Sequence, residues 1–165
     1  MGTEELTSPE STSQATRVSE GSGQLLHAGT LAHTAEGAAL CFLTFCQAGF
    51  SVIGPHQHPD VTLDCIAVGR SLHAWDRGDY ASIRMVLSQS TDRLVGAGAD
   101  FFVCPCNTAH LALEQPGAEL ALPGLHIADV AAPARLHQLL AIAAFDVAIG
   151  RQPMPSWRGG PVPTS

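Results

Sequence analysis

Short apolar runs alternate with longer stretches of helical periodicity along this chain, and this alternation restricts the fold more than any other feature. The most compact run is Phe101–Cys104, which is bounded by an aspartate and a proline. Residues 61–65 alternate as a half-buried strand does, and residues 25–32 and 125–128 are two further short, mostly apolar runs. We expect a strand at each of these positions.

The stretches between these runs carry helix signals. Thr34 is placed to cap a helix that continues to about Ala48, where Gly49 serves as the stop. Asp79 can cap a second helix that ends near Gly96, and further helices are expected from about residue 107 and from about residue 131. Strands separated by amphipathic helices indicate an α/β fold, in which a parallel sheet is flanked by helices on both faces.

Composition divides the chain into three parts. Residues 1–23 are rich in Ser, Thr, Glu and Gly and contain almost no large apolar side chains, so they predict a disordered tail. Residues 24–150 hold the alternating pattern and form the expected α/β domain. Residues 151–165 are rich in Pro and Gly, which predicts an irregular tail.

Charge and cysteine usage exclude several classes of protein. The 165 residues carry a net charge of -7 with only 8 basic side chains, which argues against a nucleic-acid partner. We expect no membrane span and no leader peptide, and therefore a cytoplasmic protein. The 5 cysteines are an odd number at irregular spacing, so free thiols are expected instead of disulfides.

A cysteine at the end of a predicted strand is the first candidate for chemistry. Ligands of parallel sheets bind in the crevice beyond the carboxyl ends of the strands, where residues 33–37, 105–110 and 129 onward are expected to lie. Cys106 lies at the turn between strand and helix, where free N–H groups and the helix dipole favour a thiolate. Asn107 and Thr108 offer donors that can hold a carboxylate beside it.

The same segment carries a resemblance to a known family. The run PCNTAH over residues 105–110 resembles the first-cysteine motif of aspartate/glutamate racemases. The run LPGLHIAD over residues 122–129 is similar to the strand and turn that follow that motif in the family. The resemblance extends over roughly residues 25–132, a little over half of the chain.

The first predicted loop adds a weaker part of the resemblance. The run LAHTAEG over residues 31–37 lies where the family has a loop containing a Ser or Thr and a Glu. Thr34 and Glu36 match that pattern, whereas Ala38 stands where many relatives have Thr. His33 lies in the same loop and joins Thr34 and Glu36 as a candidate substrate contact.

The resemblance implies a fold and a mechanism. The fold would be one half of the two-domain aspartate/glutamate racemase fold, with the site between the two halves. The mechanism would be racemisation of an amino acid without pyridoxal phosphate or any other cofactor. One cysteine thiolate removes the Cα proton and a second cysteine returns a proton on the opposite face. Cys106 matches the first of these two cysteines, so the implied partner is a small amino acid or carboxylate.

The second half of such a fold does not follow in this sequence. The resemblance fades from about residue 132, and no cysteine comes after Cys106. We hypothesise a truncated or frame-shifted version of a longer gene, whose activity as a half-length chain is open. A homo-oligomer could oppose two copies of Cys106, although the natural halves are not identical surfaces.

Two other functions remain open. The chain could be an inactive remnant or binding module that keeps the crevice without the chemistry. It could also be a related isomerase of the same superfamily, which includes hydantoin racemases and maleate isomerases; arylmalonate decarboxylases belong there too. The sequence does not separate the substrates of these enzymes.

Metal binding is not expected from the cysteine and histidine pairs. Cys104 and Cys106 form a Cys-x-Cys pair, but no second ligand pair follows at zinc-like spacing. Cys104 is expected in the core, and Cys106 could itself be one more buried thiol. His56 and His58 lie in a Gly/Pro loop, where a solvated turn is the simpler interpretation.

Each remaining candidate also has a purely structural interpretation. Thr34 can cap its helix, and Glu36 in the first turn is what helix electrostatics favours. His33 is as well suited to a structural role as to a ligand contact. His110 could assist proton transfer or simply pack, and His126 is expected to be a buried core histidine.

Overall fold

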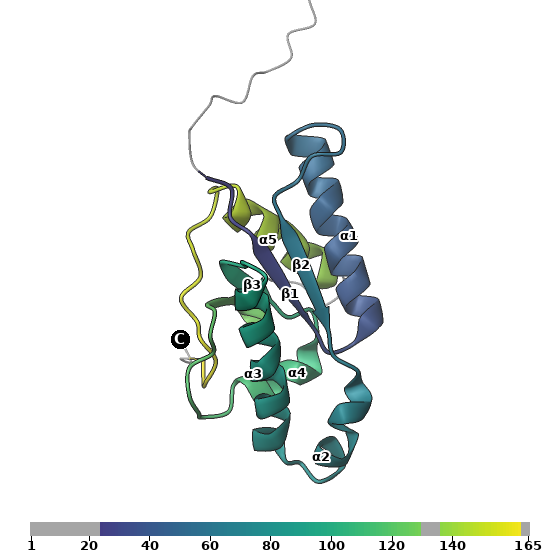
Figure 1. The fold of residues 1–165 in the computed structure, drawn as a ribbon, viewed down its shortest axis with the longest axis vertical. Coiled ribbons are helices and arrows are strands. Elements are labelled where there is room, and N and C mark those ends of the chain that lie inside the picture. The colour runs from purple at the N-terminus through teal and green to yellow at the C-terminus, as the bar shows by residue number, and fades with distance from the viewer. Residues whose placement is uncertain (1–23, 130–135, 163–165) are drawn as a thin grey trace, which may run out of the picture.

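The computed structural model describes residues 24–129 and 136–162, so the predicted tail over residues 1–23 lies outside the described part. Four strands form one parallel sheet in the order β2-β1-β3-β4 (Figure 1). The strands are β1 (Ala28–Ala32), β2 (Val61–Cys65), β3 (Phe101–Val103) and β4 (Gly124–Leu125). The helices are α1 (Ala35–Val52), α2 (Leu72–Asp76), α3 (Tyr80–Gly96), α4 (Asn107–Leu113) and α5 (Leu136–Ala148), with 3-10 turns at Val68–Arg70 and Ile127–Asp129.

Helices cover both faces of the sheet, which confirms the predicted fold class. Helices α1 and α5 pack together on one face, where Phe45 and Phe145 meet edge to face with ring centroids 5.9 Å apart. Helices α3 and α4 cover the other face, where Ile83 and Leu87 of α3 are fully buried. Each helix therefore buries an apolar stripe against the sheet.

Strand β3 shows why a compact apolar run predicts a strand in this fold. Successive side chains point to opposite faces, so Phe101 and Val103 join the core under α1 and α5. Phe102 points the other way and joins the core under α3 and α4. Phe101 and Phe102 have no exposed surface, and burying such a ring contributes about 2–3 kcal/mol. A strand buried on both faces has no polar alternation to show.

Helix α3 begins as the sequence predicts. The Asp79 carboxylate accepts a hydrogen bond from the Ser82 backbone N–H at 3.1 Å and another from the Ser82 hydroxyl at 2.7 Å. The helix ends at Gly96, which is also the predicted end. An N-cap of this kind satisfies donors that the first turn leaves free.

The prediction that Gly49 ends the first helix is wrong, because α1 continues to Val52. Gly49 is buried inside the helix, where an added Cβ would lie 2.4 Å from the Cβ of His58. The glycine therefore allows the loop over residues 54–60 to cross the helix closely. Gly49 is therefore needed because the backbone of another segment comes close to the helix, and not because the helix ends there.

Four further elements differ from the sequence prediction. The first strand begins at Ala28 and not at residue 25, and the fourth covers only Gly124–Leu125. Helix α2 and the 3-10 turn before it were not predicted, because so short a segment carries little periodicity. The predicted helix start near residue 131 falls in 130–135, outside the described residues, and α5 is described from Leu136.

Helix α1 meets a criterion that the sequence analysis did not anticipate. It is 18 residues long with a mean hydropathy of 1.3, which is long and apolar enough to cross a bilayer by length and composition alone. The side chains of Cys41 and Phe45 on this helix are nevertheless buried against the domain core. Core helices of globular domains pass the same test, so this property does not indicate a location.

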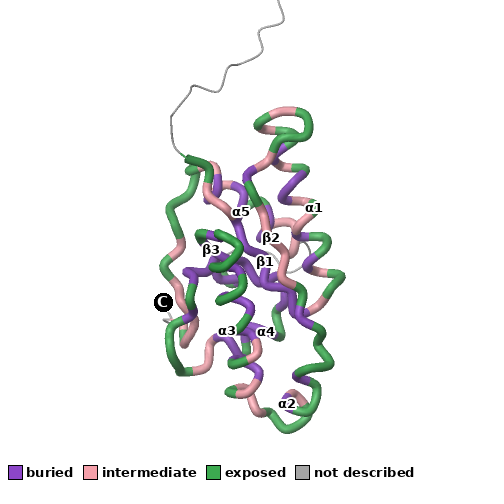
Figure 2. Tube along the Cα trace, viewed as in Figure 1, coloured by how far each residue is buried: buried purple, intermediate pink, exposed green. Residues whose placement is uncertain are grey.

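The segment over residues 151–162 has no helix and returns to the edge of the sheet (Figure 1). Its residues are exposed or of intermediate burial (Figure 2). Trp157 forms an isolated antiparallel bridge with Gly124, whose N–H donates to the Trp157 carbonyl at 2.7 Å. Leu120 N–H donates to the Arg158 carbonyl at 3.0 Å. The segment over residues 151–162 is thus irregular and packed along β4, and the domain boundary at residue 150 stays a prediction.

Candidate functional site

The strand order places a topological switch point between β1 and β3. The chain leaves β1 into α1 on one face of the sheet and leaves β3 into α4 on the other face. Connections that diverge in this way open a crevice at the carboxyl ends of the two strands. Residues 33–37 and 104–108 follow these two strands, at the place where ligands of such sheets are expected to bind.

The two predicted loops lie against each other at this edge. A Cβ added to Gly37 would lie 2.9 Å from the carbonyl oxygen of Pro105 and 2.6 Å from Nε2 of His137. A real side chain does not fit at such distances, so glycine is required for this contact. The structure therefore joins the start of α1, the cysteine loop and the start of α5 at one place.

Cys106 is the N-cap residue of α4, with an extended backbone at φ -144° and ψ 106°. Its side chain is buried, with 8% of its surface exposed, and belongs to the apolar cluster under α3 and α4. The sulfur makes no capping hydrogen bond. The thiol is thus buried in the core, directly before the exposed Asn107 and Thr108.

The residues expected to bind a carboxylate surround the two helix starts. Asn107 and Thr108 are the first residues of α4, and both are exposed. Thr34 is the N-cap residue of α1, as predicted, but its side chain forms no capping hydrogen bond. Glu36 is exposed in the first turn of α1. Their roles in binding stay predictions.

His33 differs from these residues because it is enclosed. Its side chain is 3% exposed, and Nε2 lies 3.0 Å from the Ser71 hydroxyl oxygen. Ser71 donates its own proton to the Val68 carbonyl at 3.1 Å, so His33 Nε2 is the donor in the first contact. Burial lowers the pKa of His33, which keeps the ring neutral. Its ring also packs against Trp75 at 5.7 Å.

The other cysteines have different environments. Cys104 has no exposed surface, which confirms its expected place in the core, and burial raises the pKa of its thiol. Burial also raises the pKa of Cys41 to about 12 and raises that of Cys46. Cys65, at the end of β2, is exposed. All 5 cysteines are free, as predicted.

A separate hollow lies away from this crevice. It has a volume of about 420 Å³ between α3 and the loop over residues 116–121, and Arg84 and Asp92 line it. No predicted site residue contributes to its wall. The Arg84 guanidinium is itself engaged, because it donates to the carbonyls of Leu113 and Ala118. We therefore place the candidate site at the strand ends.

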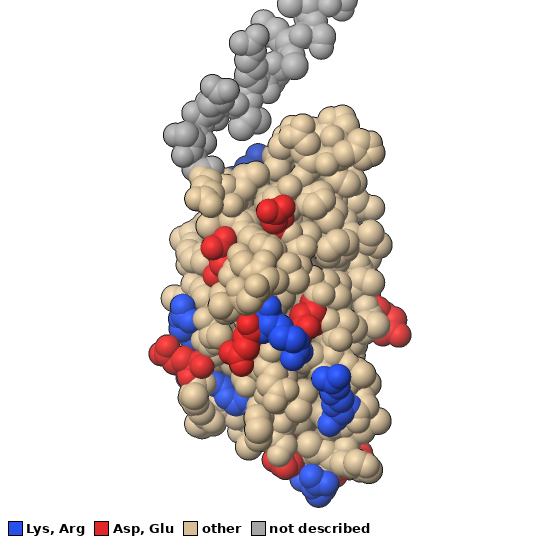
Figure 3. All heavy atoms as spheres, viewed as in Figure 1, with Lys and Arg blue, Asp and Glu red and all other residues tan. Residues whose placement is uncertain are grey.

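The charged side chains are mixed on the face drawn in Figure 3, where arginines and acidic residues alternate without a continuous basic patch. The upper part of this face, beside α1, carries few charges.

The fold and this thiol define a class: a doubly wound α/β domain with a cysteine at the switch point of its sheet. No family model and no curated protein match the sequence. Among solved structures, the chain is similar to a crystal structure from Yersinia pestis described as a "putative Asp/Glu Racemase", with 22% identity and a TM-score of 0.56. The similarity covers 64% of this chain and 46% of that chain. At this identity the likeness shows the fold.

Sequence reasoning missed three residues that shape the site. Ser71 and Trp75 enclose His33 from the short segment around α2. His137 approaches Gly37 from α5. All three lie at least 38 residues from their contacts, as the 38-residue separation of His33 and Ser71 illustrates. Isolated Ser, Trp and His residues carry no motif, so the sequence offered no signal for them.

Proposed function

We propose that this chain is one half of a cofactor-independent amino-acid racemase, in which Cys106 transfers the Cα proton of a small amino acid or related carboxylic acid. The observation that carries the proposal is the position of Cys106, which caps α4 beside the first residues of α1 at the switch point of the sheet. The fold shared with the Yersinia pestis structure described as a "putative Asp/Glu Racemase" supports it. The PCNTAH run is an independent support.

Two helix starts supply the groups that would bind the substrate carboxylate. Thr34 offers a hydroxyl that makes no cap bond, and Asn107 and Thr108 offer an exposed amide and hydroxyl. The backbone N–H groups in the first turn of α1 add donors and a favourable dipole. Glu36, in that turn, is the acidic group available for the substrate ammonium.

The chemistry requires removal of a weakly acidic proton. A thiolate at Cys106 takes the Cα proton, and the donors around the carboxylate stabilise the negative charge that develops there. Inversion needs a second acid on the opposite face of the carbon. No cysteine follows Cys106 in this sequence, so the chain alone is proposed to exchange the proton without inverting the centre.

Hydrogen exchange tests this proposal directly. The purified chain is incubated in deuterated water with L- and D-aspartate and L- and D-glutamate, and deuterium at Cα is followed by NMR. Cys106→Ala should abolish the exchange. Cys65→Ala is the matched control, because it removes an exposed thiol from the same edge of the sheet and should leave the rate unchanged.

Two outcomes would contradict the proposal. One is the absence of exchange with every one of these amino acids, and the other is exchange that Cys106→Ala does not reduce. Circular dichroism of both variants establishes that they are folded. Chiral chromatography of the products then separates exchange with retention from racemisation.

A binding module is the second candidate, because the sequence holds no second cysteine beyond Cys106. Such a module would bind a small carboxylate at the same crevice without exchanging its proton. A ligand-induced rise in the melting temperature that Thr34→Val reduces, in the absence of any exchange, would favour this function over the racemase.

A further inference from the structure

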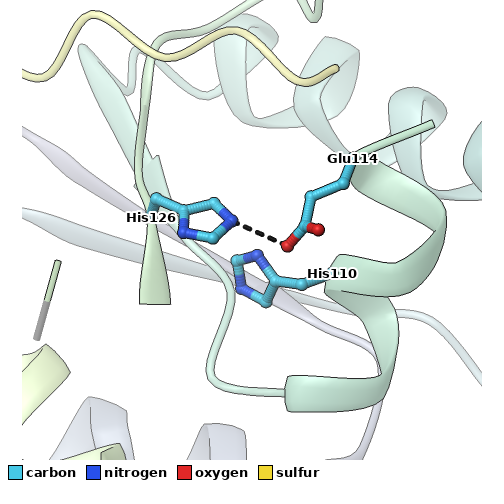
Figure 4. A group of neighbouring side chains, drawn as sticks. All are labelled: His110, Glu114 and His126. Atoms are coloured by element: carbon cyan, nitrogen blue, oxygen red, sulfur yellow. Dashed lines mark hydrogen bonds and ion pairs between the residues drawn. The ribbon is translucent and has the colours of Figure 1, made fainter. Parts of the chain in front are cut away.

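Two histidines and one glutamate form a cluster behind the cysteine loop (Figure 4). His110 lies on α4, Glu114 is the C-cap residue of that helix about one turn later, and His126 follows β4. One ligand atom from each residue lies within 4.8 Å of the other two. The rings of His110 and His126 are buried, and Glu114 is half-buried with its side chain 38% exposed.

His110 has an unsatisfied nitrogen that faces this cluster. Nε2 lies 3.1 Å from the carbonyl oxygen of Cys104, which can only accept, so Nε2 carries the proton. Nδ1 therefore holds a lone pair. This atom is buried and has no hydrogen-bond partner among the described residues. Figure 4 shows it directed toward the carboxylate of Glu114.

A lone pair buried without a donor is costly, so its position indicates a missing partner. A cation would satisfy the lone pair and would also neutralise the neighbouring carboxylate. The anchoring of the opposite ring nitrogen to a backbone carbonyl is typical of histidines that bind zinc.

We propose that His110, Glu114 and His126 form a zinc site, with His110 Nδ1, a Glu114 carboxylate oxygen and His126 Nε2 as ligands. Two imidazoles and one carboxylate are a donor set that zinc accepts, and a water can complete the tetrahedron. Glu114 is the partly exposed member and gives the ion an entry path from solvent. The proposal does not rest on the proposed racemase function.

The geometry requires small rearrangements. Ligand atoms around a tetrahedral zinc with bonds of about 2.0–2.1 Å lie roughly 3.3 Å apart. His126 Nε2 and the Glu114 oxygen are 2.9 Å apart and must separate slightly, while the distances to His110, within 4.8 Å, must shorten. All three side chains already converge, so no change of fold is needed.

The protons also balance. His126 Nε2 now donates to Glu114, and its Nδ1 accepts from the Ala128 N–H at 3.1 Å. When Nε2 binds zinc, the same proton resides on Nδ1, and the N–H of Ala128, an exposed residue, loses this acceptor. No proton is gained or lost by the ring.

Trp157 closes the other side of the cluster. Its ring centroid lies 4.6 Å from that of His126 and 5.8 Å from that of His110. An aromatic wall of this kind limits water around the ion and fixes the orientation of its ligands. A zinc ion here would tie α4 to the end of β4, directly behind the loop that carries Cys106.

Metal binding to the full chain tests the proposal. The protein is treated with a chelator, dialysed and titrated with zinc chloride, and bound metal is measured by calorimetry and by elemental analysis. We expect one zinc per chain. Glu114→Gln keeps an acceptor for His126 but removes the charged ligand, and should weaken zinc binding by about tenfold or more.

Controls separate this site from other histidines and thiols. His56→Ala and His58→Ala remove two histidines of the loop over residues 54–60, and each should leave the zinc affinity unchanged. Cobalt replaces zinc in a second titration, because its absorption spectrum distinguishes nitrogen and oxygen ligands from thiolates. We expect a tetrahedral spectrum without a thiolate band.

Three results would overturn the proposal. These are failure of the dialysed protein to retain zinc, zinc binding that Glu114→Gln leaves unchanged, and a cobalt spectrum with thiolate ligation. His126→Asn serves as a second variant, and its circular dichroism shows whether it folds. None of these readouts depends on proton exchange at an amino acid.

Discussion

Arg93 of α3 donates two hydrogen bonds to the carboxylate of Asp64 at the end of β2, from Nε at 2.9 Å and from Nη2 at 2.7 Å. The Ser90 hydroxyl donates to the same carboxylate. A two-pronged contact of this kind is more specific than a simple ion pair. It fastens the outer strand of the sheet to the helix that covers it.

This contact makes the stability depend on pH. The hydrogen bonds from Arg93 lower the pKa of Asp64 from its ordinary value of 3.8. A lowered pKa stabilises the fold fully above the unfolded-state value, and the contribution is lost as pH falls through the folded-state value. Asp64→Asn should therefore cost about 1 kcal/mol at pH 7, and the difference from wild type should shrink below pH 3.8.

Urea unfolding of both proteins across this pH range measures that difference. Asp76→Asn is the control, because Asp76 is exposed on α2 and makes no ion pair within the described residues. A gap between Asp64→Asn and wild type that stays constant down to pH 2 would show that the carboxylate does not act through its charge.

The contact between Gly37 and Pro105 leads to a second prediction. Gly37→Ala gains about 1 kcal/mol of helix propensity. The new methyl group would lie 2.9 Å from a backbone oxygen that cannot rotate away, and overpacking of this kind costs about 1–3 kcal/mol. The cost of overpacking should exceed the gain in helix propensity, so thermal unfolding should show a net loss of stability.

The variant should also affect the candidate site, since it pushes the start of α1 away from the cysteine loop. Gly96→Ala at the end of α3 is the matched control, because no atom lies within 4 Å of the added Cβ. We expect it to be neutral or slightly stabilising. Equal stabilities of the two variants would mean that the loops are not packed as described.

The sequence predicted those parts of the fold that depend on local patterns. Strand β3 is a continuous apolar run, and the cap at Asp79 depends on a neighbour three residues away, so both are visible in one short window. The fourth strand is shorter than predicted because His126 leaves the sheet to reach Glu114. Tertiary contacts of this kind override a local apolar pattern.

The candidate site was predictable only where it is contiguous. Cys106, Asn107 and Thr108 follow one strand, so a single motif contains them. The contact of His33 with Ser71 spans 38 residues of sequence. The contact of Gly37 with His137 joins α1 and α5, which are the first and last helices along the sequence. Contacts made by folding leave no spacing that one sequence can show.

The third prediction concerns Arg84, whose buried guanidinium links α3 to the end of α4 and the loop that follows it. Its side chain donates to the carbonyls of Leu113 and Ala118, the latter at 2.6 Å. Arg84→Met fills similar space but leaves both acceptors without this donor, which should cost about 2–3 kcal/mol. Arg77→Met, which removes an exposed ion pair with Asp79 at 3.8 Å, should cost much less, because solvent screens an exposed pair.

Denaturant unfolding of the two arginine variants gives this comparison directly. A loss of stability for Arg84→Met no greater than that for Arg77→Met would mean that water replaces the guanidinium at both carbonyls. Limited proteolysis adds a local measure, since the loop over residues 114–121 should be cut faster in Arg84→Met than in wild type.

The fourth prediction concerns Trp157 and the domain boundary at residue 150 that the composition predicts. Removing the Trp157 side chain tests whether the domain extends beyond that boundary. Its indole packs on Phe102 at 6.1 Å, and its carbonyl pairs with Gly124. Removing a half-buried indole should cost about 2–3 kcal/mol, below the range for fully buried aromatic residues. Deleting residues 151–165 should cost at least as much, because the backbone bonds along β4 are lost as well.

Met154→Ala is the matched control within the same segment, because Met154 is 43% exposed and should contribute little. Unfolding midpoints of Trp157→Ala, Met154→Ala and the deletion are compared in one denaturant series. If the deletion unfolds at the wild-type midpoint, the domain does end at residue 150 and the bridge to Gly124 adds nothing. If it unfolds earlier, together with Trp157→Ala, the irregular segment is part of the folding unit despite its Pro/Gly-rich composition. Burial of one aromatic ring then outweighs the local preference for disorder.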